Sequence, residues 1–174
     1  MKPRRPLLML LIAVVTLTSC GLEQDLADRK GLDRSSVIVA PPLSAPTLDG
    51  AHFDLSQQHG HVVIIDFWAS WCGPCHKQQP ELDRIHDLYA PRGLVMVGVD
   101  LRDNEAAARA YQQEFHVPYP SIFDADGAIT SAFDIAAPPT TLIVDGTGHI
   151  VLRQLGGITA AGLSPTLDRL MPRK

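Results

Sequence analysis

Hydrophobic and polar positions along the chain separate strand-like from helix-like stretches. Residues 62–68 form a nearly continuous run of β-favouring side chains, which predicts a strand buried on both faces. Residues 94–99 repeat this pattern and predict a second buried strand. Between the two runs, apolar side chains recur at helical spacing and predict a helix. The apolar positions of this helix are Leu82, Ile85, Leu88 and Tyr89.

Proline and capping residues refine the predicted helices. Pro74 stands where the first turn of a helix tolerates proline, and Pro80 predicts a kink further along. Asp103 is expected to cap a second helix at 104–115, where glutamate, alanine and glutamine favour helix. This part of the chain therefore predicts the order β-α-β-α.

The C-terminal part adds further strands and helices. An extended piece at 119–123 is followed by an Asp-Gly turn at 126–127 and a brief helix. Two strands, 140–144 and 149–154, are predicted to pair as a hairpin. A closing helix follows at about 159–170. The predicted fold class is α/β with a mixed sheet.

The N-terminal residues are typical of a secretory signal. Three basic residues precede an apolar run at 6–17, which is shorter than the ~20 residues of a membrane-spanning helix. The tetrad 17–20, Leu-Thr-Ser-Cys, resembles the lipobox of bacterial lipoproteins, which implies removal of residues 1–19 and acylation of Cys20. A membrane-spanning helix and an ordinary cleavage that leaves Cys20 as a free thiol stay open as alternatives.

Residues 20–42 are predicted to be a lipidated cysteine followed by a flexible linker, and residues 43–174 the folded domain. The linker is rich in charged residues and ends at Pro41-Pro42. As a flexible chain it would span roughly 25 Å, enough for the domain to work close to a membrane surface. A short amphipathic helix packed on the domain is the alternative.

Composition and charge narrow the function classes. The 174 residues are 45% hydrophobic and 20% charged, which is sufficient for one domain with a substantial core. The net charge of −4, without a basic block, argues against nucleic acid as a partner. Removal of the three basic residues with the signal leaves a charge of −7. Anionic lipids would not attract such a chain, so the acyl group would have to hold it at the membrane.

The chemistry lies in Cys72 and Cys75, a Cys-x-x-Cys pair that follows the first buried strand. A cysteine at a helix N-terminus meets free backbone N–H groups and the helix dipole, which favour the nucleophilic thiolate. The second cysteine, one turn further on, is placed to attack the mixed disulfide and release the product thiol. A structural staple is disfavoured, because so short a loop restricts the unfolded chain only a little.

Metal binding is the alternative for the same pair. Zinc is disfavoured because the chain has no second Cys-x-x-Cys. Two cysteines and a distant histidine could bind Cu(I), so a copper metallochaperone stays open, although a surface position is the default for each histidine. These histidines are His52, His59, His61, His86, His116 and His149, whereas His76 next to the motif is a nitrogen ligand without a partner.

Residues 67–75, Phe-Trp-Ala-Ser-Trp-Cys-Gly-Pro-Cys, resemble the thioredoxin superfamily, specifically the TlpA/ResA-like membrane-anchored thiol-disulfide oxidoreductases. Asp66, Pro80 and the Pro-Thr-Thr stretch at 139–141 support this resemblance, which covers about 43–172. It implies a thioredoxin-like fold with an inserted strand and helix of the TlpA type. It also implies that a redox-active Cys72–Cys75 disulfide serves as the redox centre without a further cofactor.

The resemblance implies roles for individual residues. Pro139 matches the cis-proline of the family, whose loop faces the active-site disulfide and pairs with the substrate chain. Gly156 matches a small residue that lines the substrate groove, a role that Gly157 could also fill. Trp71, next to the nucleophile, is expected to shape the docking surface.

Two positions depart from the TlpA/ResA pattern. Many of these proteins have a glutamate where this chain has Gln78, and they often lack the acid that Asp66 supplies here. Because Asp66 lies within an apolar run, we expect a buried carboxyl group beneath Cys75, with a raised pKa, that takes the proton of the Cys75 thiol. The alternative is a hydrogen-bonded aspartate without a part in proton transfer.

The function implied by the resemblance is an extracytoplasmic, lipid-anchored enzyme that reduces protein disulfides, for example in apocytochrome c during cytochrome c maturation. The implied partners are protein thiol or disulfide substrates, a membrane thiol-electron donor and, through the anchor, the membrane itself. Secreted compartments are oxidising, so the direction of electron flow stays open. An oxidase or isomerase of secreted proteins is the first alternative, and the copper carrier is the second.

Overall fold

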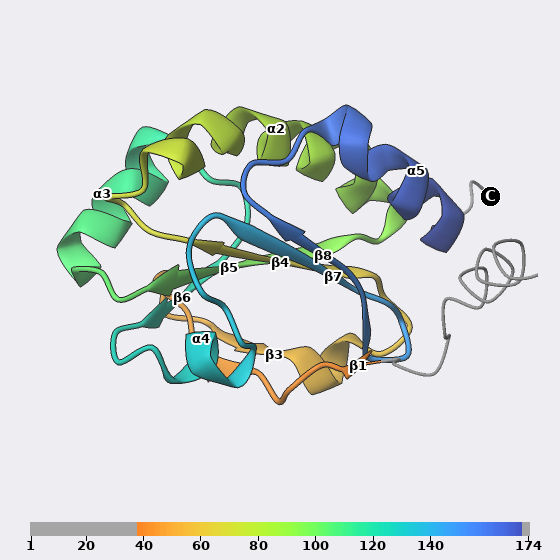
Figure 1. The fold of residues 1–174 in the computed structure, drawn as a ribbon, viewed down its shortest axis with the longest axis horizontal. Helices are drawn as coiled ribbons and strands as arrows, with labels where there is room; N and C mark the ends of the chain where they lie inside the picture. The colour runs from red at the N-terminus through yellow and green to blue at the C-terminus, as the bar shows by residue number, and fades with distance from the viewer. Residues whose placement is uncertain (1–37, 172–174) are drawn as a thin grey trace, which may run out of the picture. The chain divides into compact units, whose positions relative to one another are not determined.

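A six-stranded mixed sheet forms the centre of the part of the chain that the computed structural model describes, residues 38–171 (Figure 1). The strand order is β1-β8-β7-β4-β5-β6, and β2 and β3 form a separate pair. The predicted signal segment and Cys20 lie outside the described residues. The elements are β1 (Ile38–Val39), β2 (Ser44–Pro46), β3 (His52–Asp54), η1 (Leu55–Gln58), β4 (Val63–Trp68), α2 (Gly73–Tyr89), η2 (Ala90–Arg92), β5 (Val95–Leu101), α3 (Glu105–Glu114), β6 (Ser121–Asp124), α4 (Ala128–Ala132), β7 (Thr140–Val144), β8 (His149–Leu155) and α5 (Ala160–Leu170).

The directions of the strands determine which edge of the sheet carries the Cys-x-x-Cys segment. β4, β5 and β6 run parallel, so the C-terminal ends of all three meet at one edge of the sheet. β7 runs antiparallel to β4 with Phe67 opposite Thr140, which brings the start of β7 to that same edge. We call this edge the active edge, because the Cys-x-x-Cys segment leaves β4 there.

The core consists of two layers, one on each face of the sheet. Side chains of β4 alternate between them: Ile64 packs with α2 and α5, whereas Ile65 and Phe67 pack on the opposite face with Phe53 and Phe133. In Figure 1, α2, α3 and α5 lie on one side of the sheet, and α4 and β3 lie on the other. All six residues of β4 are buried, as the continuous apolar run predicts for a strand covered on both faces.

The structure confirms the α/β fold class and the main predicted elements. β4, α2, β5, β7, β8 and α5 all lie within a few residues of their predicted ranges, and Pro74 and Pro80 lie in α2 as expected. Leu88 is a correction: the helical spacing predicts it in the buried stripe of α2, but it is 59% exposed, because it lies on the solvent side of the last turn.

The cap of α3 is a second correction. The sequence predicts Asp103 as the cap of this helix, but Asn104 fills the position, its side chain accepting hydrogen bonds from the backbone N–H groups of Ala106 and Ala107. The Asp103 carboxylate turns instead toward the segment between β4 and α2. The helix thus begins one residue later than the sequence suggests. The Asp103 carboxylate is therefore available for contacts at the active edge.

The short elements before β4 are absent from the sequence prediction. β2 and β3 have three residues each, too few for a period of two to stand out from the surrounding sequence. Ile38 and Val39, which lie in the stretch predicted as a linker, pair with Ile150 and His149 of β8. Among the described residues, no helix is both long and apolar enough to cross a membrane.

Candidate active site

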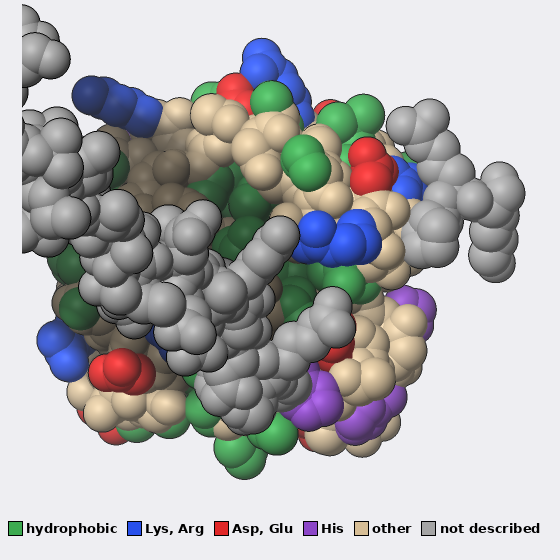
Figure 2. Space-filling model, turned by 45° about the vertical axis from the view of Figure 1, so that its right-hand side comes forward, with side chains coloured by type: hydrophobic (Ala, Val, Ile, Leu, Met, Phe, Trp, Pro, Cys, Tyr) green, Lys and Arg blue, Asp and Glu red, His purple; other side chains and the backbone are tan. Residues whose placement is uncertain are grey.

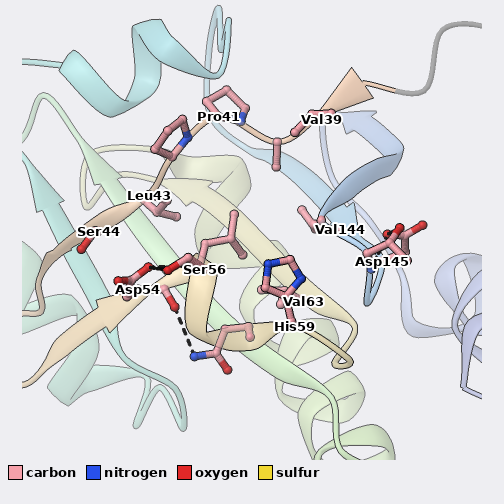
Figure 3. Close-up of a pocket in the computed structure, with 16 residues that line it drawn as sticks. Val39, Pro41, Leu43, Ser44, Asp54, Ser56, His59, Val63, Val144 and Asp145 are labelled. Carbon is pink, nitrogen blue, oxygen red and sulfur yellow. Dashed lines mark hydrogen bonds between the residues drawn. The ribbon is translucent and has the colours of Figure 1, made fainter.

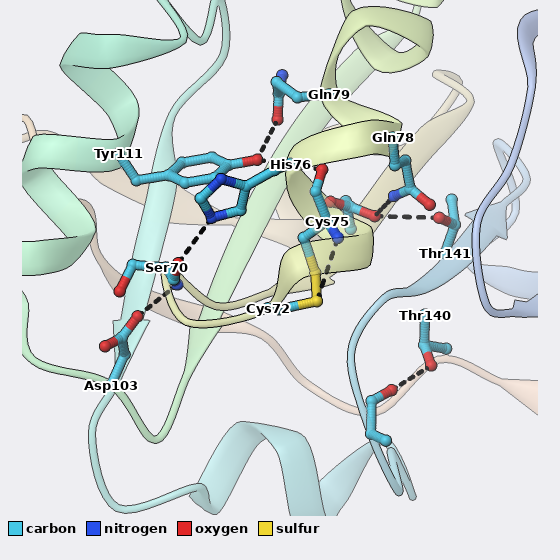
Figure 4. Close-up of a disulfide and its surroundings, with 12 residues drawn as sticks. Ser70, Cys72, Cys75, His76, Gln78, Gln79, Asp103, Tyr111, Thr140 and Thr141 are labelled. Atoms are coloured by element: carbon cyan, nitrogen blue, oxygen red, sulfur yellow. Dashed lines mark hydrogen bonds between the residues drawn. A yellow bond between two sulfur atoms is a disulfide. The ribbon is translucent and has the colours of Figure 1, made fainter.

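The Cys-x-x-Cys segment lies where the sequence analysis expects it, between β4 and α2. Cys72 is the N-cap residue of α2, and Pro74 occupies the first turn, where its missing N–H costs no helical hydrogen bond. Cys72 and Cys75 form a disulfide, and both side chains are buried. The Cys72 sulfur accepts a hydrogen bond from the Cys75 backbone N–H at 3.2 Å (Figure 4).

This geometry has a direct consequence for the reduced enzyme. The N–H group that meets the Cys72 sulfur is one of the donors left free at the start of a helix. Together with the helix dipole it stabilises negative charge on that sulfur more than on a sulfur inside the helix. Cys72 therefore has the better environment for a thiolate, whereas Cys75 lies one turn into α2.

The other predicted site residues come to the same edge. The Pro138–Pro139 peptide bond is cis, as the resemblance implies for Pro139. The Pro139 carbonyl accepts a hydrogen bond from Gly156 N at 2.9 Å, so the loop before β7 and the turn after β8 lie together. Gly156 has a φ of 77°, a left-handed conformation that glycine adopts without strain.

Exposed apolar side chains border this edge. Trp71 is 59% exposed, as expected for a residue of a docking surface rather than of the core. Leu155, opposite Thr140 in the β7–β8 pairing, is 65% exposed. Sequence analysis missed Leu155, because an apolar residue at a strand end is normally assigned to the core.

Asp66 is buried on the α2 face of β4. Strand alternation places it between Ile64 and Trp68, which both lie on this face. Its Oδ1 accepts hydrogen bonds from Gln78 Nε2 at 2.8 Å and from Thr141 Oγ1 at 3.0 Å (Figure 4). Burial raises the pKa of Asp66 to about 7, although these two hydrogen bonds act in the opposite direction.

Gln78 joins the buried acid to the loop after β8. Its Nε2 donates to Asp66, and its Oε1 accepts from Ile158 N at 3.1 Å. Sequence analysis noted only that Gln78 stands where many TlpA/ResA-like proteins have a glutamate. The contacts show what the amide does: with a donor and an acceptor on one side chain, it satisfies two buried groups of opposite polarity.

His76 is half-buried beside the Cys-x-x-Cys segment. Its Nε2 donates to the Ser70 carbonyl at 2.7 Å, and its ring packs edge-on against Tyr111 and Phe115. Tyr111 in turn stacks on Trp68 and donates to the Cys75 carbonyl at 3.3 Å. No sequence pattern signals these contacts, because Tyr111 and Phe115 come from α3 and its C-terminal end, 35 to 39 positions further along the chain.

The histidines named for a copper site do not surround the cysteines. His59 lies close to Gly148 in the β7–β8 turn, and His61 hydrogen-bonds to the Gly93 carbonyl. Both precede β4, at the edge opposite the cysteines, and a six-residue strand separates the edges by roughly 20 Å. Figure 2 shows several histidines gathered on one side of the face it draws. Within residues 38–171, no group of three potential ligands could hold a metal ion.

A cavity of about 420 Å³ lies at that opposite edge as well. Figure 3 shows its lining, which includes Leu43, Asp54, His59, Val63 and Val144. Val63 begins β4 and Val144 ends β7, so the length of both strands separates this cavity from the disulfide. The thiol chemistry and this cavity are therefore distinct features.

A helix that begins at a Cys-x-x-Cys disulfide, on a mixed sheet with a cis-proline beside it, defines a thiol-disulfide oxidoreductase with a thioredoxin-like fold. The comparisons with known proteins agree. The chain belongs to the Redoxin family, whose model matches residues 35–168.

Relatives and solved structures support the same class. Thiol-disulfide oxidoreductase ResA of Bacillus cereus is 25% identical over 133 residues, covering 76% of this chain and 77% of the relative. ResA of Bacillus subtilis is 25% identical, covering 76% and 74%. A Chlorobium tepidum protein assigned as thiol:disulfide interchange protein DsbE is 28% identical with a TM-score of 0.68, covering 76% and 93%. StoA from Bacillus subtilis shares the fold, at 24% identity and a TM-score of 0.64, covering 73% and 96%.

The two cysteines should differ in their mutant phenotypes. Cys75→Ser is expected to accumulate mixed disulfides with substrate proteins, because Cys72 still attacks and nothing resolves the adduct. Cys72→Ser should trap almost none. Non-reducing gels of the two variants, with the double variant as control, measure this directly. Equal trapping by both single variants would contradict the assignment of Cys72 as nucleophile.

Asp66→Asn should slow the resolving step while changing attack by Cys72 less. The uncharged amide keeps the hydrogen bonds but cannot accept the Cys75 proton. Rapid-mixing kinetics from pH 6 to 9 separate the two steps. If the variant resolves the mixed disulfide as fast as the parent protein over that range, Asp66 takes no part in proton transfer.

The same substitution should raise stability on the alkaline side. A raised pKa in the folded state means that the stabilising contribution of protonated Asp66 is complete below the unfolded pKa of 3.8 and is lost as the pH rises through about 7. Relative to Asp66→Asn, the parent protein should lose about 3 kcal/mol of unfolding free energy between pH 5 and pH 9. Urea unfolding at pH 5 and pH 9 checks this; parallel losses in both proteins would show an ordinary pKa.

Proposed function

We propose that this thiol-disulfide oxidoreductase works outside the cytoplasm as a lipid-anchored reductase of protein disulfides. The observation that carries the proposal is the active edge itself: a helix-capping Cys72, a cis-proline loop and two exposed apolar side chains, Trp71 and Leu155, lie at one border of the sheet. A protein chain can contact all three, and its disulfide would then lie beside the Cys72 sulfur.

The reaction balances without a further cofactor. The Cys72 thiolate attacks one sulfur of the substrate disulfide, which breaks the S–S bond, forms a mixed disulfide and releases one substrate thiolate. The Cys75 thiol gives up its proton and attacks the Cys72 sulfur, which releases the second substrate thiol. Two electrons pass to the substrate, and the enzyme is left with the Cys72–Cys75 disulfide. A membrane thiol-electron donor would reduce that disulfide for the next turnover.

Apocytochrome c is the proposed substrate class, because the haem-attachment cysteines of its Cys-x-x-Cys-His motif must be reduced before haem is attached. The family resemblance stated above is what supports this choice. A bare dithiol in an oxidising compartment would become a disulfide, so the proposal requires a dedicated donor. Without such a donor, the same site would act as an oxidase or isomerase of secreted proteins.

The midpoint potential of the Cys72/Cys75 couple tests the direction. A reductase should lie near the −270 mV of thioredoxin and an oxidase near the −120 mV of DsbA, a separation of about 7 kcal/mol for two electrons. Equilibration with glutathione and dithiothreitol buffers gives the value. A potential above about −180 mV, in the range of protein disulfide isomerase and DsbA, would overturn the reductase proposal. Stoichiometric Cu(I) binding by the reduced protein would favour the copper carrier.

The anchor can be tested at Cys20. Cys20→Ala should abolish the membrane-bound mature form, because acylation requires the sulfur and two or three acyl chains are what would hold the protein at the bilayer. The redox activity of a protein expressed without residues 1–20 should be unchanged. Membrane fractionation with Cys20→Ala and Cys20→Ser, compared with the parent protein, measures the effect. A Cys20→Ala protein that stays membrane-bound after signal cleavage would contradict lipidation.

A further inference from the structure

The segment between β4 and α2 is held at Ser70 from both sides. The Ser70 backbone N–H donates to Asp103 Oδ2 at 2.5 Å, and the Ser70 carbonyl accepts from His76 Nε2 at 2.7 Å (Figure 4). Asp103 belongs to the loop between β5 and α3, and His76 to the first turns of α2. Two elements therefore fix the backbone two residues before Cys72.

Behind Asp103 lies Asp100, a carboxyl group with no ordinary partner. Asp100 is fully buried in β5, with Trp68 of β4 and Phe123 of β6 as its lateral neighbours. Neither of its carboxyl oxygens receives a hydrogen bond from an N–H or hydroxyl donor among residues 38–171. The neighbouring Arg102 places its guanidinium against Gly127, and the described residues offer Asp100 no ion pair.

A buried, unpaired carboxylate is too costly to persist, so Asp100 takes up a proton. Burial raises its pKa to about 8, and the nearby acids Asp103 and Asp124 act in the same direction. Asp103 shows the opposite behaviour: burial raises its pKa, but hydrogen bonds from Ser70, Asn104 and Asp100 outweigh burial and lower it. The two neighbouring acids thus have opposite tendencies, and a proton on Asp100 has the Asp103 carboxylate as its acceptor.

We propose that Asp103, held in place by the proton of Asp100, is a positioning residue for the reactive segment: it fixes Ser70 and thereby the direction of the Cys72 sulfur. Attack on a disulfide needs the nucleophile in line with the bond it breaks, and a displacement of about 1 Å can cost up to about 100-fold in rate. The proposal concerns the thiol-disulfide chemistry and does not depend on which substrate or direction is physiological.

The pair also predicts a pH profile. An ordinary cysteine reacts faster as the pH rises and then levels off once it is fully a thiolate. Here, Asp100 ionises as the pH passes about 8, the shared proton is lost, and the buried Asp100 carboxylate and the half-buried Asp103 carboxylate repel each other. The charged groups that act on Asp100 from neighbouring segments, Asp103 and Asp124, are both acids and cannot relieve that repulsion. Attack by Cys72 should therefore decline on the alkaline side.

The test measures attack by Cys72 on a small aromatic disulfide, in a Cys75→Ser background, from pH 6 to 10. Asp103→Ala should slow attack about tenfold, because Ser70 loses its acceptor. Asp54→Ala is the matched control: Asp54 also accepts a backbone N–H, that of Ser56 at 2.8 Å, but it lines the cavity at the opposite edge. It should leave the attack rate within about twofold of the parent, since it touches no part of the active edge.

The Asp100 variants separate positioning from stability. Asp100→Ala removes the donor to Asp103 and should slow attack severalfold at pH 7. Asp100→Asn supplies an amide N–H in place of the acid proton, so it should recover the rate at pH 7 and also abolish the alkaline decline. If Asp100 only stabilised the fold, Asp100→Asn would not abolish the alkaline decline in the rate of attack by Cys72.

Two results would overturn the proposal. One is an Asp103→Ala rate within about twofold of the parent protein at every pH. The other is an alkaline decline in Asp100→Asn equal to that of the parent. If Asp103→Ala does not fold, the pH profile of Asp100→Asn decides alone.

Discussion

The active edge depends on how β4 ends. This strand is covered on both faces, so its side chains must alternate between two apolar layers, and the chain must then leave the sheet at Trp68 to begin α2. Asp66 is the polar position within this alternation. The periodicity that builds the core therefore also places a carboxyl group on the face covered by the helix that carries Cys75. The same six residues therefore fix both the packing of the core and the position of this buried carboxyl group.

Three acids at this edge have different charge states because they have different numbers of donors. Asp103 accepts two backbone N–H groups and the Asp100 proton, and these overcome its partial burial. Asp66 accepts two neutral side-chain donors, which do not compensate for complete burial. Asp100 has no such donor. With Asp66 and Asp100 largely or partly protonated near neutral pH, the Cys72 thiolate faces less negative charge than three aspartates in the sequence suggest.

The sequence analysis correctly predicted those features of the fold that short-range sequence patterns determine. The runs at 62–68 and 94–99 identified β4 and β5, and the Cys-x-x-Cys motif identified the start of α2. The predictions that were wrong concern residues whose contacts come from distant segments. Asp103 has the sequence context of a helix cap, but its carboxylate accepts a hydrogen bond from Ser70, 33 positions away. Likewise, nothing in the sequence around His76 indicates that α3 packs against its ring. No periodicity along one segment records such pairings, so the supports of the site came only from the structure.

The exposed side chains of the active edge indicate what kind of substrate the fold can select. Trp71 and Leu155 leave apolar surface in water beside a buried disulfide. Covering a large aromatic side chain removes on the order of 100 Å² of apolar surface from water, which is about 2 to 3 kcal/mol. A small thiol can reach the sulfur but cannot cover both side chains. A protein chain can, and its backbone can also pair along the loop at Pro139. The proposed selectivity for protein disulfides therefore rests on the border of the site, and the proposed reactivity of Cys72 rests on the helix start and the segment that holds it.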